Sequence, residues 1–251
     1  MIKILFILIC FFFNAFSREI GQTEITTDEG IEVFQKEKYY LLKKNVNIIS
    51  DSYVLKADIV KAYFEKDLYD IAIIETKGNS LLTSNDGVII RGENINFAIK
   101  EEKISVNGKN SSIKDNQIKM FSNNLIEINN KSGDFKLLGE KSELETENIY
   151  ILGEKIIENF INLDKIKEIK KLIVQDKSIA LFKTDKYLFY ASKAVYIKKD
   201  NLIELFDNVK IIRDGETIIG DYAKINTLDQ SYKIESNKNN KVKILINNTN
   251  E

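Results

Sequence analysis

Histidine, proline and tryptophan are absent from this chain of 251 residues, and Cys10 is its single cysteine. Without histidine or a second cysteine, the chain excludes disulfides, most zinc sites, and serine or cysteine nucleophiles that rely on a histidine base. The glycine-rich patterns of phosphate-binding loops and dinucleotide folds are missing as well. We therefore expect no enzyme, no metal site and no cofactor.

Neither sign of charge is in excess. The chain has 37 Lys and Arg residues and 38 Asp and Glu residues, which gives a net charge of −1. A nucleic-acid-binding surface requires a basic excess, so no nucleic-acid partner is expected. Charges of both signs are scattered along the chain, as on the solvated face of a soluble domain.

Residues 1–17 have the organisation of an export signal. Lys3 precedes an apolar run of about ten residues that ends at Phe13, too short to span a bilayer about 30 Å thick. Small and polar residues then offer a cleavage site before Arg18. We predict a cleaved signal and a mature protein without cysteine, with an uncleaved membrane anchor as the alternative.

A short block recurs along the chain: a small or polar residue, an acidic or hydroxyl residue, and apolar residues two and four places later. A period of two places those apolar residues on one face of a strand, so the repeats predict a large antiparallel β structure with one apolar wall. The copies begin at Ala57-Asp58, Gly92-Glu93, Thr146-Glu147, Ala191-Ser192 and Gly220-Asp221.

Short runs of strand-forming residues, separated by residues typical of turns, extend from about residue 24 to residue 246. We predict an elongated open antiparallel β-jellyroll of repeated strand pairs. It is one domain over 24–246, with two related halves at about 24–110 and 111–246, and a frayed tail at 247–251. The spacing of Ile156, Ile157, Phe160 and Ile161 differs from the rest and predicts a short helix or loop insertion over 154–162.

The acidic residues of the blocks are candidates for acid–base chemistry. They are Asp58, Glu93, Glu147 and Asp221. Because each occupies an equivalent place in its own repeat, we expect them to be spread along the molecule, capping turns at strand starts. Several aromatic residues could line a sugar or lipid site, although sheet packing is the favoured interpretation. They are Tyr39, Tyr40, Tyr63, Phe97, Phe135, Tyr196 and Tyr222.

Two segments carry a family resemblance. The segment 207–211 (DNVKI) followed by 214–223 (DGETIIGDYA), and the segment 44–48 (KNVNI) followed by 56–60 (KADIV), resemble the signature of the OstA-like family of periplasmic lipopolysaccharide transport proteins, which includes LptA. The resemblance covers about residues 24–246. Lys44 and Asp207 stand where the family usually has glycine, and the chain has extra length near 100–170.

The resemblance implies a passive bridge that stacks head to tail in the periplasm. Such a bridge would shield the acyl chains of lipopolysaccharide in an apolar groove, between an inner-membrane LptC-like partner and an outer-membrane LptD-like partner. The groove is expected to be lined by the inward residues of the blocks and of the preceding strands. These lipid-binding candidates are Val46, Ile48, Val60, Ala62, Ile95, Phe97, Ile149, Ile151, Val209, Ile211, Ala223 and Ile225.

Other interpretations stay open at this point. The same apolar residues also fit a closed core without cargo. With its N-terminal segment retained, the chain would resemble the LptC-like anchored partner of the same fold. A third possibility is a secreted β-repeat scaffold or adhesion protein without lipid.

Overall fold

The computed structural model describes residues 19–163, 166–237 and 240–246, so the predicted signal and the predicted tail lie outside the described residues. The described part consists of strands and one short 3₁₀ helix, η1 (Lys198–Asp200). The strands are β1 (Glu24–Thr26), β2 (Ile31–Phe34), β3 (Tyr39–Ile49), β4 (Tyr53–Phe64), β5 (Ile71–Lys77), β6 (Ser80–Ser84), β7 (Ile89–Gly92), β8 (Asn94–Ala98), β9 (Lys103–Asn107), β10 (Ser111–Lys114), β11 (Lys119–Ser122), β12 (Leu125–Asn129), β13 (Asp134–Glu145), β14 (Ile149–Leu163), β15 (Ile166–Thr184), β16 (Leu188–Ile197), β17 (Leu202–Arg213), β18 (Glu216–Asn226), β19 (Tyr232–Glu235) and β20 (Lys243–Ile246).

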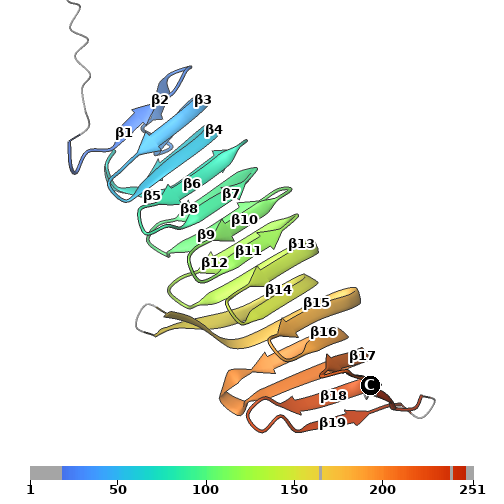
Figure 1. Cartoon of the computed structure of the whole chain (residues 1–251). Coiled ribbons are helices and arrows are strands. Elements are labelled where there is room, and N and C mark those ends of the chain that lie inside the picture. Colours follow the sequence, from blue (N-terminus) through green and yellow to red (C-terminus); the bar gives the residue numbers. More distant parts are fainter. Residues whose placement is uncertain (1–18, 164–165, 238–239, 247–251) are drawn as a thin grey trace, which may run out of the picture.

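The strands form one long antiparallel sheet of 20 strands. Figure 1 shows the strands following one another along one elongated structure, which we call the ladder, with β1 and β2 at one end and β18 and β19 at the other. Among the described residues the end strands do not pair with each other, since β1 and β2 pair with β3, and β19 and β20 pair with β18. The sheet is therefore open and not a closed barrel, which confirms the predicted all-β, open antiparallel architecture.

Each long strand is bent near its middle, which divides the sheet into two half-sheets. The first half of β4 pairs with β6 and its second half with β5. In the same way, the first half of β13 pairs with β12 and its second half with β11. We call β1, β6, β7, β10, β11 and β20 half-sheet I, and β2, β5, β8, β9, β12 and β19 half-sheet II. Strands β3, β4 and β13 to β18 run through both.

The half-sheets face each other across a single apolar core. Val60 in half-sheet II and Leu144 in half-sheet I are both 0% exposed and belong to one hydrophobic cluster. A lone sheet would leave one face in water, so complete burial requires that each half-sheet covers the other. The molecule is thus a wedge in cross-section, with a corner where the strands bend and an open side where the hairpin turns lie.

The bends are made by local irregularities in the ladder. In β3 the register shifts between Lys43 and Val46, and the two residues between them, Lys44 and Asn45, have φ of 66° and 51°. In β17 Asp207 and Asn208 have φ of 59° and 55° at the corresponding shift. Bulges of this kind bend a strand and raise its twist, which turns each strand around the corner.

The recurring sequence block is explained by the corner. Its small residue faces inward at the narrow end of the wedge, as Ala57 and Ala191 do at 5% and 1% exposure. A methyl group added at Gly92 would lie 2.5 Å from Val106 Cγ1, and one added at Gly220 would lie 2.6 Å from Ile234 Cγ2. The residue after the small one points out of the corner, and apolar residues then fill the wider part of the wedge.

One copy of the block was assigned wrongly. Thr146 and Glu147 lie in the turn between β13 and β14, on the open side. The corner of β14 is instead at Gly153-Glu154, where the register with β15 shifts after Leu152. Ile149 and Ile151 still face inward, because they keep the alternation of the same strand.

The predicted helix or loop insertion over 154–162 is wrong, since these residues lie in β14. The inward positions include Ile156, Glu158 and Phe160, which are 0%, 7% and 3% exposed. A glutamate on the buried face hides the period of two. Only the spacing of four between the flanking apolar residues then remains visible, and it mimics a helix.

Candidate functional site

The twelve lipid-binding candidates share one interior. Ten of them are at most 7% exposed, while Phe97 and Ile149 are partly buried against the same core. Both half-sheets contribute, so the structure does bring together residues from four separate repeats. Their contact with lipid stays a prediction, because burial alone also describes a closed core.

The open side of the wedge carries apolar side chains that are only partly covered. Each lies next to a hairpin turn and, as a rule, two residues from a buried neighbour. On half-sheet I they are Tyr53, Val88, Ile149 and Tyr187; on half-sheet II they are Phe97, Ile104 and Tyr196. Burial raises the pKa of the Tyr53 and Tyr196 phenols, as expected for rings set at an apolar margin. Four of these seven were missed from the sequence, namely Tyr53, Val88, Ile104 and Tyr187; the signal was an apolar or aromatic residue directly beside a turn.

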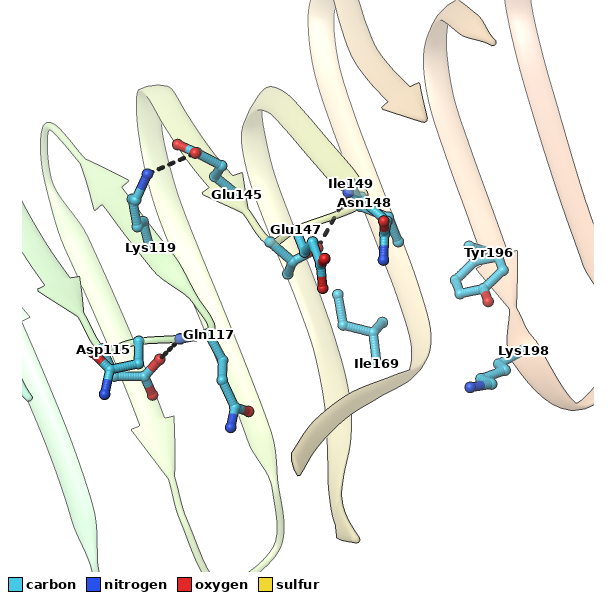
Figure 2. A pocket seen from close by; sticks show the side chains of 12 residues that line it. Asp115, Gln117, Lys119, Glu145, Glu147, Asn148, Ile149, Ile169, Tyr196 and Lys198 are labelled. Atoms are coloured by element: carbon cyan, nitrogen blue, oxygen red, sulfur yellow. Dashed lines mark hydrogen bonds and ion pairs between the residues drawn. The ribbon is translucent and has the colours of Figure 1, made fainter. Parts of the chain in front are cut away.

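A hollow of about 650 Å³ opens on this side, midway along the ladder. It lies between the β10–β11 and β13–β14 turns of half-sheet I and the ends of β15 and β16 in half-sheet II. Figure 2 shows Glu147 and Asn148 reaching from their turn toward Ile169, with Tyr196 and Lys198 beyond it. Apolar core and polar turns therefore meet in one opening.

The turns that frame the hollow are held by short polar contacts. Asp115 Oδ1 accepts hydrogen bonds from the backbone N–H groups of Gln117 and Ile118, both at 2.7 Å. Lys119 Nζ lies 2.7 Å from Glu145 Oε1, which joins the two neighbouring turns. The rim is thus organised before any ligand binds.

The acidic residues of the blocks do not converge on one pocket. Asp58 accepts a hydrogen bond from Asn79 Nδ2 at 2.9 Å, Glu93 from the Lys109 backbone N–H at 3.1 Å, and Asp221 from the Asn237 backbone N–H at 2.7 Å. These three residues are spread along the corner, and each hydrogen bond links one strand to the segment that follows it in the ladder. Asp58 and Asp221 lie within strands, so their predicted place at strand starts is wrong.

Glu158 is a buried acid outside the predicted set. Its side chain is 6% exposed, and Lys171 Nζ lies 4.0 Å from Glu158 Oε1. Glu158 Oε2 also accepts a hydrogen bond from the Asn159 backbone N–H at 3.1 Å. Loss of hydration raises the pKa of Glu158, and this effect outweighs the lowering by Lys171 and by the Asn159 N–H.

The raised pKa predicts how Glu158→Gln changes stability with pH. A folded-state pKa above the unfolded one gives a contribution that is present at low pH and is lost as pH rises through the folded value. Ionised Glu158 therefore lowers stability at pH 7, and the variant is expected to be more stable there. The gain should vanish below the normal pKa of 4.5. Urea unfolding at pH 7 and at a pH below 4.5 measures the difference in stability. Glu147→Gln, on an exposed turn, is the control and should leave stability unchanged at both. A variant less stable at pH 7 would mean that the Lys171 contact outweighs the loss of hydration.

In the described part of the chain, both ends of the ladder present unpaired strand edges with exposed apolar residues. At the first end Ile25, Ile31 and Val33 are 41%, 47% and 47% exposed, and at the other end Ile244 and Ile246 are 51% and 63% exposed. An uncovered edge of this kind is a template for pairing with another chain. Across residues 19–163, 166–237 and 240–246 no helix has the length and apolar character of a membrane span.

Comparison with known proteins finds a likeness among solved structures. No family model matches the chain, and no curated protein matches its sequence. Among solved structures, the chain is similar to LptH, the LptA-homologous periplasmic component of the conserved lipopolysaccharide transport device from Pseudomonas aeruginosa. The TM-score is 0.42 at 15% identity, over 51% of this chain and 94% of that chain.

Proposed function

We propose that this protein is a periplasmic bridge that carries lipopolysaccharide by shielding its acyl chains in the wedge interior. The observation that carries the proposal is a continuous apolar interior with an open side, along which partly covered residues such as Phe97, Ile149 and Tyr196 form a margin. This margin would give acyl chains a route from the open side into the interior.

The chemistry of the cargo supports this use of the interior. A lipid with several acyl chains exposes tens of CH₂ groups, each worth about 0.8 kcal/mol when buried, so it does not cross an aqueous compartment unaided. Acyl chains entering from the open side would part the half-sheets and replace contacts between them, while the headgroup stays in water. The strands that run through the corner, such as β4, would keep the half-sheets connected during this opening.

The unpaired ends support the proposed partners. Head-to-tail pairing of β1 and β2 with β19 and β20 of a second copy would continue both half-sheets and extend the apolar interior. The same edges would join an LptC-like protein at the inner membrane and an LptD-like protein at the outer membrane. Exposed Ile31 and Ile246 lie where such contacts would be made.

Site-specific photo-crosslinking in cells that make lipopolysaccharide tests the proposal. Phe97 is the inward reporter, because it is partly exposed, and Asn96 beside it is the exposed outward control. A lipopolysaccharide adduct at Phe97 but not at Asn96, together with a protein adduct at Ile246, is expected. Folded, exported protein without lipid adducts at Phe97 or Ile149 would instead favour a scaffold without cargo.

A further inference from the structure

One buried acid lies on the inward face of the wedge, and the shielding of acyl chains alone does not use it. Glu158 pairs with Phe135 on one side and with Leu172 on the other, and both of these belong to the apolar core. Leu172 in turn pairs with Tyr196, one of the partly covered residues of the open side. The Glu158 carboxylate therefore stands in a row of apolar side chains at the depth of the margin.

One oxygen of this carboxylate has no hydrogen-bond donor. The side chain is 6% exposed, and Oε2 accepts a hydrogen bond from the Asn159 backbone N–H. Among the described residues Oε1 accepts none, because Lys171 Nζ, at 4.0 Å, lies beyond hydrogen-bond distance. A buried acceptor without a donor is costly, and acids whose pKa is perturbed by burial and by a charged partner are concentrated at functional sites. Glu158 thus has a place for a donor that the described chain does not supply.

The charges around Glu158 restrict what that donor can be. Glu158 lines a second hollow, of about 800 Å³, beside the ends of β12, β13 and β16. The other carboxylates of its lining are Glu127 and Asp134, against the five lysines Lys103, Lys136, Lys170, Lys171 and Lys199. This positive excess disfavours a cationic ligand, so the donor that fits is neutral, a hydroxyl or an amide N–H. The same lysines are compatible with the anionic headgroup of lipopolysaccharide.

We infer that Glu158 accepts a hydrogen bond from a hydroxyl or amide N–H group within the first few carbons of a bound acyl chain. Asp134, the first residue of β13, pairs with Asn159, so Glu158 lies just inside the open side. The polar end of an acyl chain reaches this depth, while the rest of the chain continues into the apolar interior. The inference rests on the proposed function and adds a requirement on the cargo: chains with a donor near the headgroup are preferred to plain chains.

Three uncharged esters of one chain length test the inference on the purified protein. They are methyl myristate, methyl 3-hydroxymyristate and methyl 12-hydroxymyristate, and displacement of a fluorescent fatty-acid probe measures their affinities. The 3-hydroxy ester is expected to bind about tenfold more tightly than methyl myristate, from one hydrogen bond to a charged group. The 12-hydroxy ester is expected to bind more weakly than both, because its hydroxyl would be buried in the interior without a partner.

Substitutions of Glu158 separate an acceptor from a merely structural residue. Glu158→Leu removes the acceptor, so the preference for the 3-hydroxy ester should disappear while methyl myristate still binds. Glu158→Gln keeps a neutral acceptor, and the preference should fall to about threefold. Glu127→Gln is the matched control, since Glu127 lines the same hollow from the outer face, 3.6 Å from Lys136 Nζ, and should leave the preference unchanged.

The outcomes distinguish the inference from the proposed function. Equal affinity of the wild type for methyl myristate and the 3-hydroxy ester, or for the two hydroxy esters, would overturn the role of Glu158 while lipid binding stands. The full preference in Glu158→Leu or in Glu158→Gln would overturn it as well, and either variant is sufficient if the other does not fold. Failure of the probe and of all three esters to bind would overturn the proposed function itself.

Discussion

Phe97→Asp is expected to abolish capture of acyl chains and leave the protein folded. Phe97 lies near the end of β8, opposite Ile74 and Ile104, and its ring is only partly buried. Its replacement gives up part of the burial energy of a phenylalanine side chain, about 1–2 kcal/mol, because the new carboxylate can turn toward water at the open side. An acyl chain at the same place would remove that water, and an unpaired charge facing hydrocarbon is strongly unfavourable.

The matched comparison is Val60→Asp. Val60 is 0% exposed, so the same carboxylate has no route to water there. Burial of an unpaired charge is among the mechanisms that cost more than about 4 kcal/mol, and this variant is expected to unfold. Asn96→Asp introduces the same group one residue from Phe97 on the exposed outer face. It gives up the hydrogen bond from Asn96 Nδ2 to Glu75 Oε1 at 3.3 Å, so we expect a small loss of stability and unchanged capture of acyl chains.

Circular dichroism in urea measures the folding stability of each variant, and displacement of a bound fluorescent fatty acid measures its capture of acyl chains. If Phe97→Asp unfolds as Val60→Asp does, the interior is a closed core and not a cargo site. If Phe97→Asp folds and still binds lipid with unchanged affinity, the cargo lies elsewhere on the molecule.

Much of the fold could be predicted because a period of two survives in most strands. At residues 93–99 the alternation of Asn94, Ile95, Asn96 and Phe97 alone indicates a half-buried strand. The recurring small residue can also be seen in the sequence, but its position at the corner cannot be predicted from it. Only the pairing of one strand with two others shows that Gly92 and Ala57 lie at a corner and not at a strand start.

The rest could not be predicted because it depends on contacts between distant segments. Glu158 lies at an inward position between Phe135 and Leu172 of the neighbouring strands, and no local pattern indicates a buried acid. The hollow combines turns near residues 116 and 147 with Tyr196, and sequence spacing does not reveal which turns share one side of the wedge.

Gly153→Ala is expected to destabilise the protein by about 1–3 kcal/mol, the usual cost of overfilling a packed site. The φ angle of Gly153 lies outside the left-handed region, so glycine is required here for space and not for conformation. An added methyl group would lie 2.6 Å from Val174 Cγ2 and 3.0 Å from the Gln175 carbonyl oxygen.

A double-mutant cycle with Val174→Ala identifies which contact matters. Val174 is 0% exposed, so its truncation alone should cost on the order of 2 kcal/mol through the cavity it leaves. If the side-chain contact dominates, the double variant should be more stable than the sum of the two losses predicts, by about 1 kcal/mol, because the new methyl group occupies the vacated space. Strict additivity in urea unfolding would mean that the Gln175 carbonyl sets the limit. The backbones at the corner would then be at their closest approach, and the small residue of each repeat would be what allows the half-sheets to meet there.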